Sequence, residues 1–415
     1  MCVLLLFLFF LEKNMKKLFI NTFLLLVLLS SCKKEPQVTV VQTFEFKTGL
    51  IDLHFRYVGL YEQDGNEYLY FVDKEKDIKI FDFQENLFDS IPLRNIIYDF
   101  ATKRDKLQGG VQFAGKDSII FNSNYKNYIG LINHKGDILK TVCIDTILHD
   151  SLKNLNEHYF SYFPSVHNFS NDLLFHIHTN NNSSENKGLK PPTLEFYEDF
   201  FTTFYNTPYL LKVKNIFNNN PEYDFLIRNH YKQINPVPYF IIGGGSAFKV
   251  INNDIFILCL EKSLIFRYYG ENYEKLQIIE IKSDFTKIDE YIPTVKDAFS
   301  DIATTRKGIE TYQNITNLRG NIQNIFYSKN KYYVLVGHTL KTIEEFNQYE
   351  YDYRPFSVIV LDENFKKLKE YPFAADIYKY RNAVMTSKGL VIQRKEQNLT
   401  PDNYGTQTFD LLEFN

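Results

Sequence analysis

Three arginines in this sequence stand where their guanidinium groups could bind one anion together. Arg56, Arg319 and Arg381 each lie near the start of a strand-like segment. A guanidinium group offers paired N–H donors that match two oxygens of a carboxylate or phosphate. We expect these arginines, with Tyr380 and His167, to bind an acidic ligand if their strands converge. The alternative is that they are surface arginines paired with nearby acidic side chains.

Histidines and glycines offer weaker indications of chemistry. His176 and His178 share one face of a strand because alternate residues point the same way, and His167 is expected on the neighbouring strand. No Cys or carboxylate stands at a spacing that would complete a metal site, so we interpret them as polar strand residues and predict no metal and no cofactor. The run Gly243 to Ser246 opens no helix and is better interpreted as a turn than as a phosphate-binding loop.

Composition points to an all-β protein without affinity for nucleic acid. The 415 residues carry a formal net charge of −3, so no overall positive field attracts nucleic acid or an anionic membrane surface. The 30 Tyr and 38 Phe residues favour strands. No Trp is present, which excludes the Trp-containing Asp-box motifs of sialidase-type propellers.

The elements that would position these residues are repeated hairpins. Phe356 to Tyr371 is a strand, a polar turn and a second strand, and similar units recur at Ile78 to Pro92, Asn127 to Val142 and Ser263 to Ile281. The strand-like segments fall into five groups of four and a last group of three, which predicts a six-bladed β-propeller with four-stranded antiparallel blades. The groups are 54–61, 67–72, 78–83 and 87–93; 110–114, 118–121, 128–133 and 138–144; 161–168, 172–178, 209–213 and 223–227; 246–251, 255–260, 264–268 and 275–281; 321–327, 332–337, 357–361 and 367–371; and 380–385, 390–394 and 408–413.

The last group lacks one strand, and the N-terminus can supply it. Val38 to Phe46 alternates as a strand and has no partner in the first group, so we expect it to close the ring. The alternative is seven blades, with one hidden in Lys282 to Arg319.

Loop lengths divide the propeller into two unlike faces. In a four-stranded blade, the loop between strands two and three and the loop to the next blade emerge on one face, called here the long-loop face. All the long connections fall there, which makes it the expected working surface. Pro191 to Pro208 within one of them is predicted to form a short helix. The long connections are 145–160, 179–208, 228–245, 282–320, 338–356 and 395–407.

The first residues resemble the leader of a bacterial lipoprotein. Met15, followed by two lysines and an apolar run to Leu29, has the pattern of a signal peptide, and Leu29-Ser30-Ser31-Cys32 resembles a lipobox. We expect residues 1–31 to be a signal peptide with its true start at Met15, residues 32–37 to be a tether lipidated at Cys32, and residues 38–415 to be one propeller domain. The alternative is an uncleaved anchor, or an ordinary signal peptide that happens to end in Cys. The remaining cysteines, Cys143 and Cys259, are expected to be thiols.

Lipobox, repeated hairpins and ring closure together resemble six-bladed β-propeller lipoproteins of unknown function from Bacteroidota. We expect a monomer that is tethered through its lipid to the outer membrane and faces the periplasm or the cell surface. We interpret the chain as a non-enzymatic protein that binds a protein, a peptide or an anionic glycan on its long-loop face. The alternative is a glycan-active or calcium-dependent hydrolase or lyase at the channel mouth, for which Asn168, Asn321 and Asn382 are candidate ligands.

Overall fold

The computed structural model consists of small antiparallel sheets, with one short helix among the residues it describes. The structure describes residues 37–47, 58–72, 77–83, 87–92, 111–115, 117–123, 128–143, 159–160, 168–169, 172–178, 209–218, 221–227, 230, 246–259, 263–287, 318–349, 353–395 and 406–415. Residues 40–413 form one compact unit, and the six blades lie in it.

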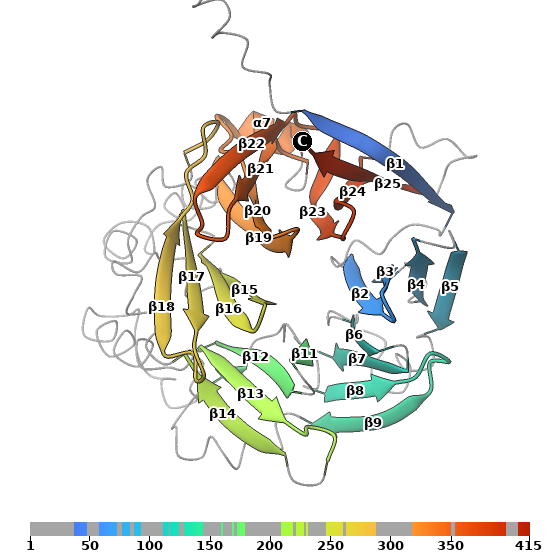
Figure 1. The fold of residues 1–415 in the computed structure, drawn as a ribbon. Coiled ribbons are helices and arrows are strands. Elements are labelled where there is room, and N and C mark those ends of the chain that lie inside the picture. Colours follow the sequence, from blue (N-terminus) through green and yellow to red (C-terminus); the bar gives the residue numbers. More distant parts are fainter. Residues whose placement is uncertain are drawn as a thin grey trace, which may run out of the picture. The chain divides into compact units, whose positions relative to one another are not determined.

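Six sheets surround a common centre and form a six-bladed β-propeller, as predicted (Figure 1). The first strand of each blade is innermost (Figure 1). Blades one to three comprise β2 (Gly59–Gln63), β3 (Asn66–Val72), β4 (Asp77–Asp82) and β5 (Leu87–Pro92); β6 (Val111–Gly115), β7 (Ser118–Ser123), β8 (Tyr128–Ile132) and β9 (Ile138–Cys143); and β10 (Tyr159–Phe160), β11 (Asn168–Phe169), β12 (Asp172–His178), β13 (Leu210–Lys214) and β14 (Glu222–Leu226).

Blades four to six complete the propeller. They comprise β15 (Ser246–Ile251), β16 (Asp254–Cys259), β17 (Leu264–Tyr269) and β18 (Lys275–Glu280); β19 (Asn321–Ser328), β20 (Lys331–Gly337), β21 (Phe356–Leu361) and β22 (Lys367–Phe373); and β23 (Tyr378–Met385), β24 (Leu390–Arg394), β25 (Thr406–Phe414) and β1 (Val38–Lys47). Within a blade, successive strands pair antiparallel, with two exceptions: β10 and β11 both pair with β12, and β1 pairs with β25. The sixth blade therefore takes its outermost strand from the N-terminal end, and the predicted ring closure is confirmed. The alternative of seven blades is wrong.

Blades are apolar on both faces because each packs between two others. In β16, Ile255 and Ile257 belong to the core cluster shared with blade three, whereas Phe256 and Leu258 belong to the cluster shared with blade five. Alternate residues of a strand point to opposite faces, so a continuous apolar run serves two inter-blade cores at once. This arrangement explains why the middle strands are the most apolar segments of the sequence.

In blades one, four and five, the turns between the first and second strands are tight two-residue hairpins. Asp64-Gly65, Asn252-Asn253 and Lys329-Asn330 occupy the turns, and both residues of each have positive φ. This conformation matches the twist of two antiparallel strands, and Asn, Asp and Gly adopt it readily. The six long connections predicted from the sequence join second to third strands or one blade to the next, so they share the opposite, long-loop face.

One helix, α7 (Ile343–Tyr349), lies in the long connection between β20 and β21. Thr342 Oγ1 accepts a hydrogen bond from the amide of Glu345, and the carboxylate of Glu345 accepts one from the amide of Lys341. This exchange is a capping box that fixes the first turn of the helix. Among the described residues, no helix is long and apolar enough to cross a membrane. The predicted helix at 191–208 and the leader lie outside the described residues.

Candidate functional site

Buried polar side chains gather in blades five and six. Of the buried polar or charged residues that the structure describes, most belong to strands β19 to β25 or to their connections. Burial of a polar group is costly unless hydrogen bonds compensate for the lost water, so such a concentration marks a candidate functional site. These residues are Asn321, Arg354, Ser357, Glu370, Lys379, Asn382, Thr386, Gln393, Gln407 and Asp410.

The innermost strands of these two blades are both irregular near the long-loop face. In β19, Ile322 pairs with Val336 and Asn324 with Leu335, so one residue is inserted. In β23, the pairing passes from Lys379 directly to Ala383, and three residues bulge out. Bulges are common next to functional sites because they redirect side chains. The bulges occur on strands of adjacent blades that contact each other.

Tyr380, in the bulge of β23, reaches the neighbouring blade. Its ring stacks on Phe356 with centroids 5.6 Å apart. A methyl group on the Cα of Gly337 would lie 2.9 Å from Asn321 Oδ1, 3.0 Å from the Tyr380 hydroxyl and 3.2 Å from Arg354 Cδ. The side chains of Asn321, Tyr380 and Arg354 therefore pack closely around the Cα of Gly337, the last residue of β20. This close approach requires glycine at that position.

Arg354 is fully buried beneath the entry to β19. Its Nη1 donates a hydrogen bond to the carbonyl oxygen of Arg319 at 2.7 Å and a longer one to that of His338 at 3.4 Å. The buried guanidinium thus fixes the backbone from which the Arg319 side chain projects. Arg319 and Arg381 are both part-exposed. We call Arg319, Asn321, Arg354, Tyr380 and Arg381 the blade 5/6 mouth.

A row of hydrogen-bonded side-chain amides connects the bulge of β23 to the next two strands of blade six. Asn382 Nδ2 donates to Gln393 Oε1 at 2.6 Å, and Gln393 Nε2 donates to Gln407 Oε1 at 2.5 Å. The row crosses three strands of blade six and anchors the residue that follows Arg381. Tyr380 and Arg381 are therefore presented by a bulge with fixed flanks, and a rigid bulge orders a site before a ligand arrives.

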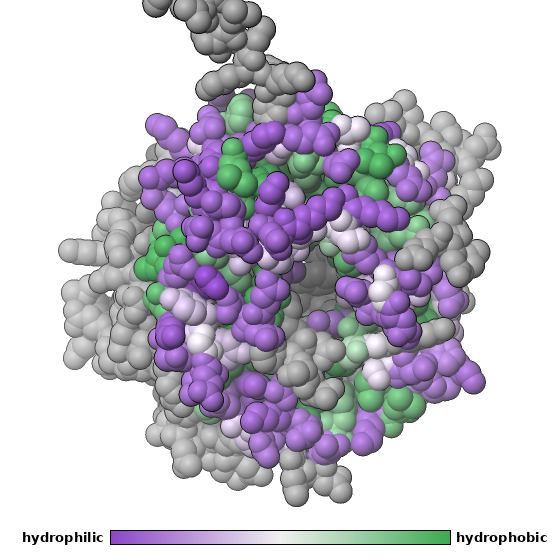
Figure 2. Space-filling model, viewed as in Figure 1, coloured by the Kyte–Doolittle hydropathy of each residue, from purple (hydrophilic) through white to green (hydrophobic). Residues whose placement is uncertain are grey.

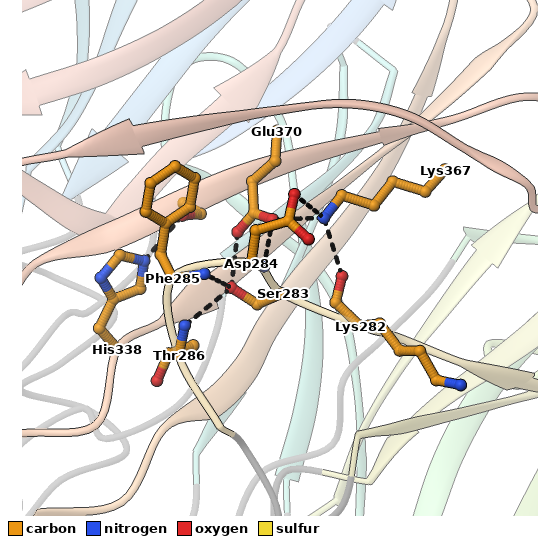
Figure 3. Close-up of polar contacts among 9 residues, drawn as sticks. Lys282, Ser283, Asp284, Phe285, Thr286, His338, Lys367 and Glu370 are labelled. Carbon is orange, nitrogen blue, oxygen red and sulfur yellow. Dashed lines mark hydrogen bonds and ion pairs between the residues drawn. The ribbon is translucent and has the colours of Figure 1, made fainter.

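The segment 281–287 after β18 is bound to blade five by a dense set of hydrogen bonds (Figure 3). The Glu370 carboxylate accepts hydrogen bonds from Ser283 Oγ at 2.6 Å, the Asp284 amide at 2.8 Å and Lys367 Nζ at 2.6 Å. Thr339 then joins two parts of the chain, since its amide donates to Thr286 Oγ1 and its Oγ1 accepts from the amide of Gly320. Segment 281–287 thereby supports the same backbone that carries Arg319.

Glu370→Gln should loosen segment 281–287. The Glu370 carboxylate accepts hydrogen bonds from the Ser283 hydroxyl, the Asp284 amide and the Lys367 ammonium group. A neutral amide in its place is a weaker acceptor, so we expect a loss of about 2 kcal/mol in the free energy of unfolding. Hydrogen exchange of the Asp284 amide should accelerate. Glu62→Gln, which changes an exposed carboxylate on β2, is the control. Unchanged exchange of Asp284 would show that Glu370 does not hold the segment.

His338 lies under this segment as a neutral imidazole. Its Nε2 is 2.7 Å from Ser357 Oγ, and the Phe285 ring is parallel to it at 6.3 Å. Burial lowers the pKa of His338 to about 4; Glu370 opposes the shift and Arg354 adds to it. The imidazole is therefore a hydrogen-bonding group of the folded protein, and its protonation opposes folding.

Stability should consequently fall as the pH falls from about 6.5 to about 4, because in this range the unfolded chain protonates His338 and the folded chain does not. We expect His338→Gln to reduce this pH dependence, as measured by denaturant unfolding at a series of pH values. His134→Gln, in the exposed turn after β8, is the control. An identical slope for His338→Gln and the wild type would contradict the account.

The structure describes three of the five binding residues predicted from the sequence. Arg319 lies two residues before β19, and Tyr380 and Arg381 lie together in β23, so these three are on adjacent blades. Their binding of a ligand stays a prediction. Arg56 and His167 lie outside the described residues, and a joint site that includes them stays a prediction. The lipid attachment at Cys32 also lies outside them.

The histidine and asparagine candidates can be placed only in part. His176 and His178 are in β12 on one face, but their side chains are outside the description. No group of three or more His, Cys, Asp or Glu that could hold a metal occurs among the described residues. Asn321 belongs to the mouth, whereas Asn382 serves the amide row. Sequence reasoning missed Arg354, Gly337 and Glu370, whose roles arise only from contacts distant in sequence.

No protein-family model matches the chain, and no curated protein matches its sequence. Among solved structures, a member of the DUF4221 family from Bacteroides vulgatus is similar, with 16% identity, a TM-score of 0.63 and coverage of 92% of this chain and 99% of that one. A streptogramin B lyase aligns over 90% of this chain and 98% of its own, with 11% identity and a TM-score of 0.41. The first likeness supports the propeller fold alone, and the second is too distant to carry an argument.

Proposed function

We propose that this protein is an envelope-anchored binding protein whose blade 5/6 mouth holds carboxylate groups of an acidic ligand. The observation that carries the proposal is the meeting of Arg354, Asn321 and Tyr380 at Gly337, with Arg319 and Arg381 on the adjoining backbone. The part-exposed guanidinium groups of Arg319 and Arg381 are the donors that a carboxylate would meet. The buried Arg354, Asn321 and Tyr380 support the backbone that carries them.

The exposure of the two arginines suits a hydrophilic ligand. Figure 2 shows one face of the molecule, which is hollowed near its centre and hydrophilic over much of its described surface. Because the arginines are part-exposed, their attraction for an anion should weaken as salt shortens the Debye length, which is about 8 Å at physiological ionic strength. The ligand should therefore bind with salt-sensitive affinity.

Binding can be tested with polygalacturonate and polyglutamate, a glycan and a peptide that share the carboxylate group, and with neutral dextran. The double variant Arg319→Gln with Arg381→Gln should lose most of the affinity for an acidic polymer. The control double variant, Lys331→Gln with Lys366→Gln, removes the same charge from exposed turns at the other end of blade five. Equal losses in both doubles, or equal binding of dextran, would contradict a site at the mouth. Preference for one acidic polymer identifies the ligand as glycan or peptide.

Anchoring is a separate part of the proposal. If Cys32 carries lipid, the protein should fractionate with membranes, and Cys32→Ala should release it into the soluble fraction. Several acyl chains give stable anchoring, whereas one chain gives only marginal binding. Mass spectrometry should find an acylated peptide beginning at Cys32. Retention of Cys32→Ala in the membrane fraction would contradict lipid anchoring through this residue.

A further inference from the structure

The N-terminal strand β1 differs from the other outermost strands of the propeller. It lies at the end of its sheet, and among the described strands it pairs only with β25. Val40 and Val41 are 43% and 54% exposed, and no charged residue, proline or glycine occurs from Val38 to Phe44. A long, uncharged sheet edge is a template on which another strand can pair.

The other outermost strands carry protection that β1 lacks. Each exposed apolar residue on them has a charged residue within two positions, and β5 contains a charge and a proline. Charges and prolines at an edge oppose pairing with a further strand. The protecting residues are Asp89 and Pro92 in β5, Lys140 beside Leu139 in β9, Glu222 and Asp224 around Tyr223 in β14, Glu280 near Ile278 in β18, and Lys367 and Lys369 around Leu368 in β22.

We propose that β1 pairs antiparallel with β1 of a second copy of this chain, about a two-fold axis at Val41. Val41 is the centre of the uncharged run, and in this register Thr39 faces Thr43 of the other copy and Val40 faces Gln42. Valine and threonine pairs stabilise antiparallel strands. The nearest charge, Glu45, faces Gln37, so no like charges meet. The run is thus its own complement, as a two-fold interface requires.

A second copy is favoured over a foreign strand by this self-complementarity and by the place of β1 in the chain. The strand directly follows the segment expected to tether the protein, and two copies tethered to one membrane meet at a high effective concentration. The pairing replaces the monomer expected from the sequence. It does not depend on the acidic ligand or on the blade 5/6 mouth.

Cysteine cross-linking of the full chain in its native membrane tests the register. In a Cys143→Ser background, Val41→Cys should be oxidised to a species of twice the chain mass, because facing residues of antiparallel strands are about 4.5–5.5 Å apart at Cα. Val40→Cys co-expressed with Gln42→Cys should cross-link more strongly than either alone. Leu139→Cys and Ile278→Cys, each replacing a 50% exposed residue, are the controls.

Each alternative outcome overturns the proposal. Equal cross-linking of the controls would indicate random collision, and cross-linking of Val41→Cys to a protein of another mass would identify a foreign partner.

A second measurement is the native mass of the purified full chain. Val41→Lys should lose the dimer and Leu139→Lys should keep it. A monomeric wild type without cross-linking at Val41, or a Val41→Lys variant that remains dimeric, would show that β1 does not join two copies.

Discussion

Deletion of β1 should lower the melting temperature far more than deletion of the preceding tether. Phe44 of β1 is buried, and its ring lies 5.3 Å from the rings of Phe81 and Phe83 in blade one. Thr43 Oγ1 also donates a hydrogen bond to the buried Asp410 at 2.7 Å. β1 therefore links blade six to blade one, and its removal exposes β25 along its full length.

A single substitution isolates the core contribution from the pairing. Phe44→Ala should reduce the free energy of unfolding by about 3–5 kcal/mol, as is usual for a buried phenylalanine. Leu139→Ala, at an exposed site on β9, should change it by less than about 0.5 kcal/mol. Both are measured by denaturant unfolding. Similar values for the two variants, or equal melting temperatures for the two deletions, would mean that β1 does not close the ring.

Arg354→Met should be the most damaging single change near the mouth. The guanidinium is fully buried and donates to the carbonyl oxygens of Arg319 and His338. Its loss leaves both carbonyl oxygens without this donor. Hydrogen bonds from charged groups contribute about 1.5–3 kcal/mol each, and we expect a loss of ~3 kcal/mol in the free energy of unfolding. Acidic-ligand binding should fall with it, because the backbone of Arg319 is no longer held.

Two further variants separate the charge of Arg354 from its hydrogen bonds. Arg354→Lys keeps the charge but lacks the planar fork, so it should recover only part of the stability. Lys331→Met removes an exposed cation from the same blade and should have little effect on unfolding or binding. If Arg354→Met and Lys331→Met unfold alike, Arg354 does not organise the mouth.

The propeller could be predicted from the sequence because each of its strands and turns is specified by a short stretch of neighbouring residues. Alternation within strands and polar residues in turns predicted the blades, and at β16 and its turn Asn252-Asn253 the boundaries agree nearly to the residue. Agreement is poorer for the first strands of blades one and three, predicted at 54–61 and 161–168, where the structure has β2 (Gly59–Gln63) and the short strands β10 and β11. Closure followed because Val38 to Phe46 had a strand pattern but no neighbour to pair with. Helix α7 was missed although Thr342 and Glu345 stand at capping-box spacing.

The candidate site was only partly predictable, because it depends on register and on distant contacts. Arg319 and Arg381 were selected from their places near strand starts, and their role in binding stays a prediction. The bulge that carries Tyr380 has no sequence signature, since three extra residues look the same as three paired ones. Arg354 contacts a carbonyl 35 residues away, and Glu370 accepts from Ser283 at a separation of 87 residues. No local pattern in the sequence reports such contacts.

Arginine-selective chemical modification tests directly whether the blade 5/6 mouth binds an acidic ligand. The purified protein is modified with and without polygalacturonate, and the extent of modification at each arginine is measured by mass spectrometry. The ligand should protect Arg319 and Arg381 and leave Arg267, which pairs with Asp254 in blade four, unaffected. Bound ligand with no protection of Arg319 and Arg381, or with equal protection of all three, would contradict binding at the mouth.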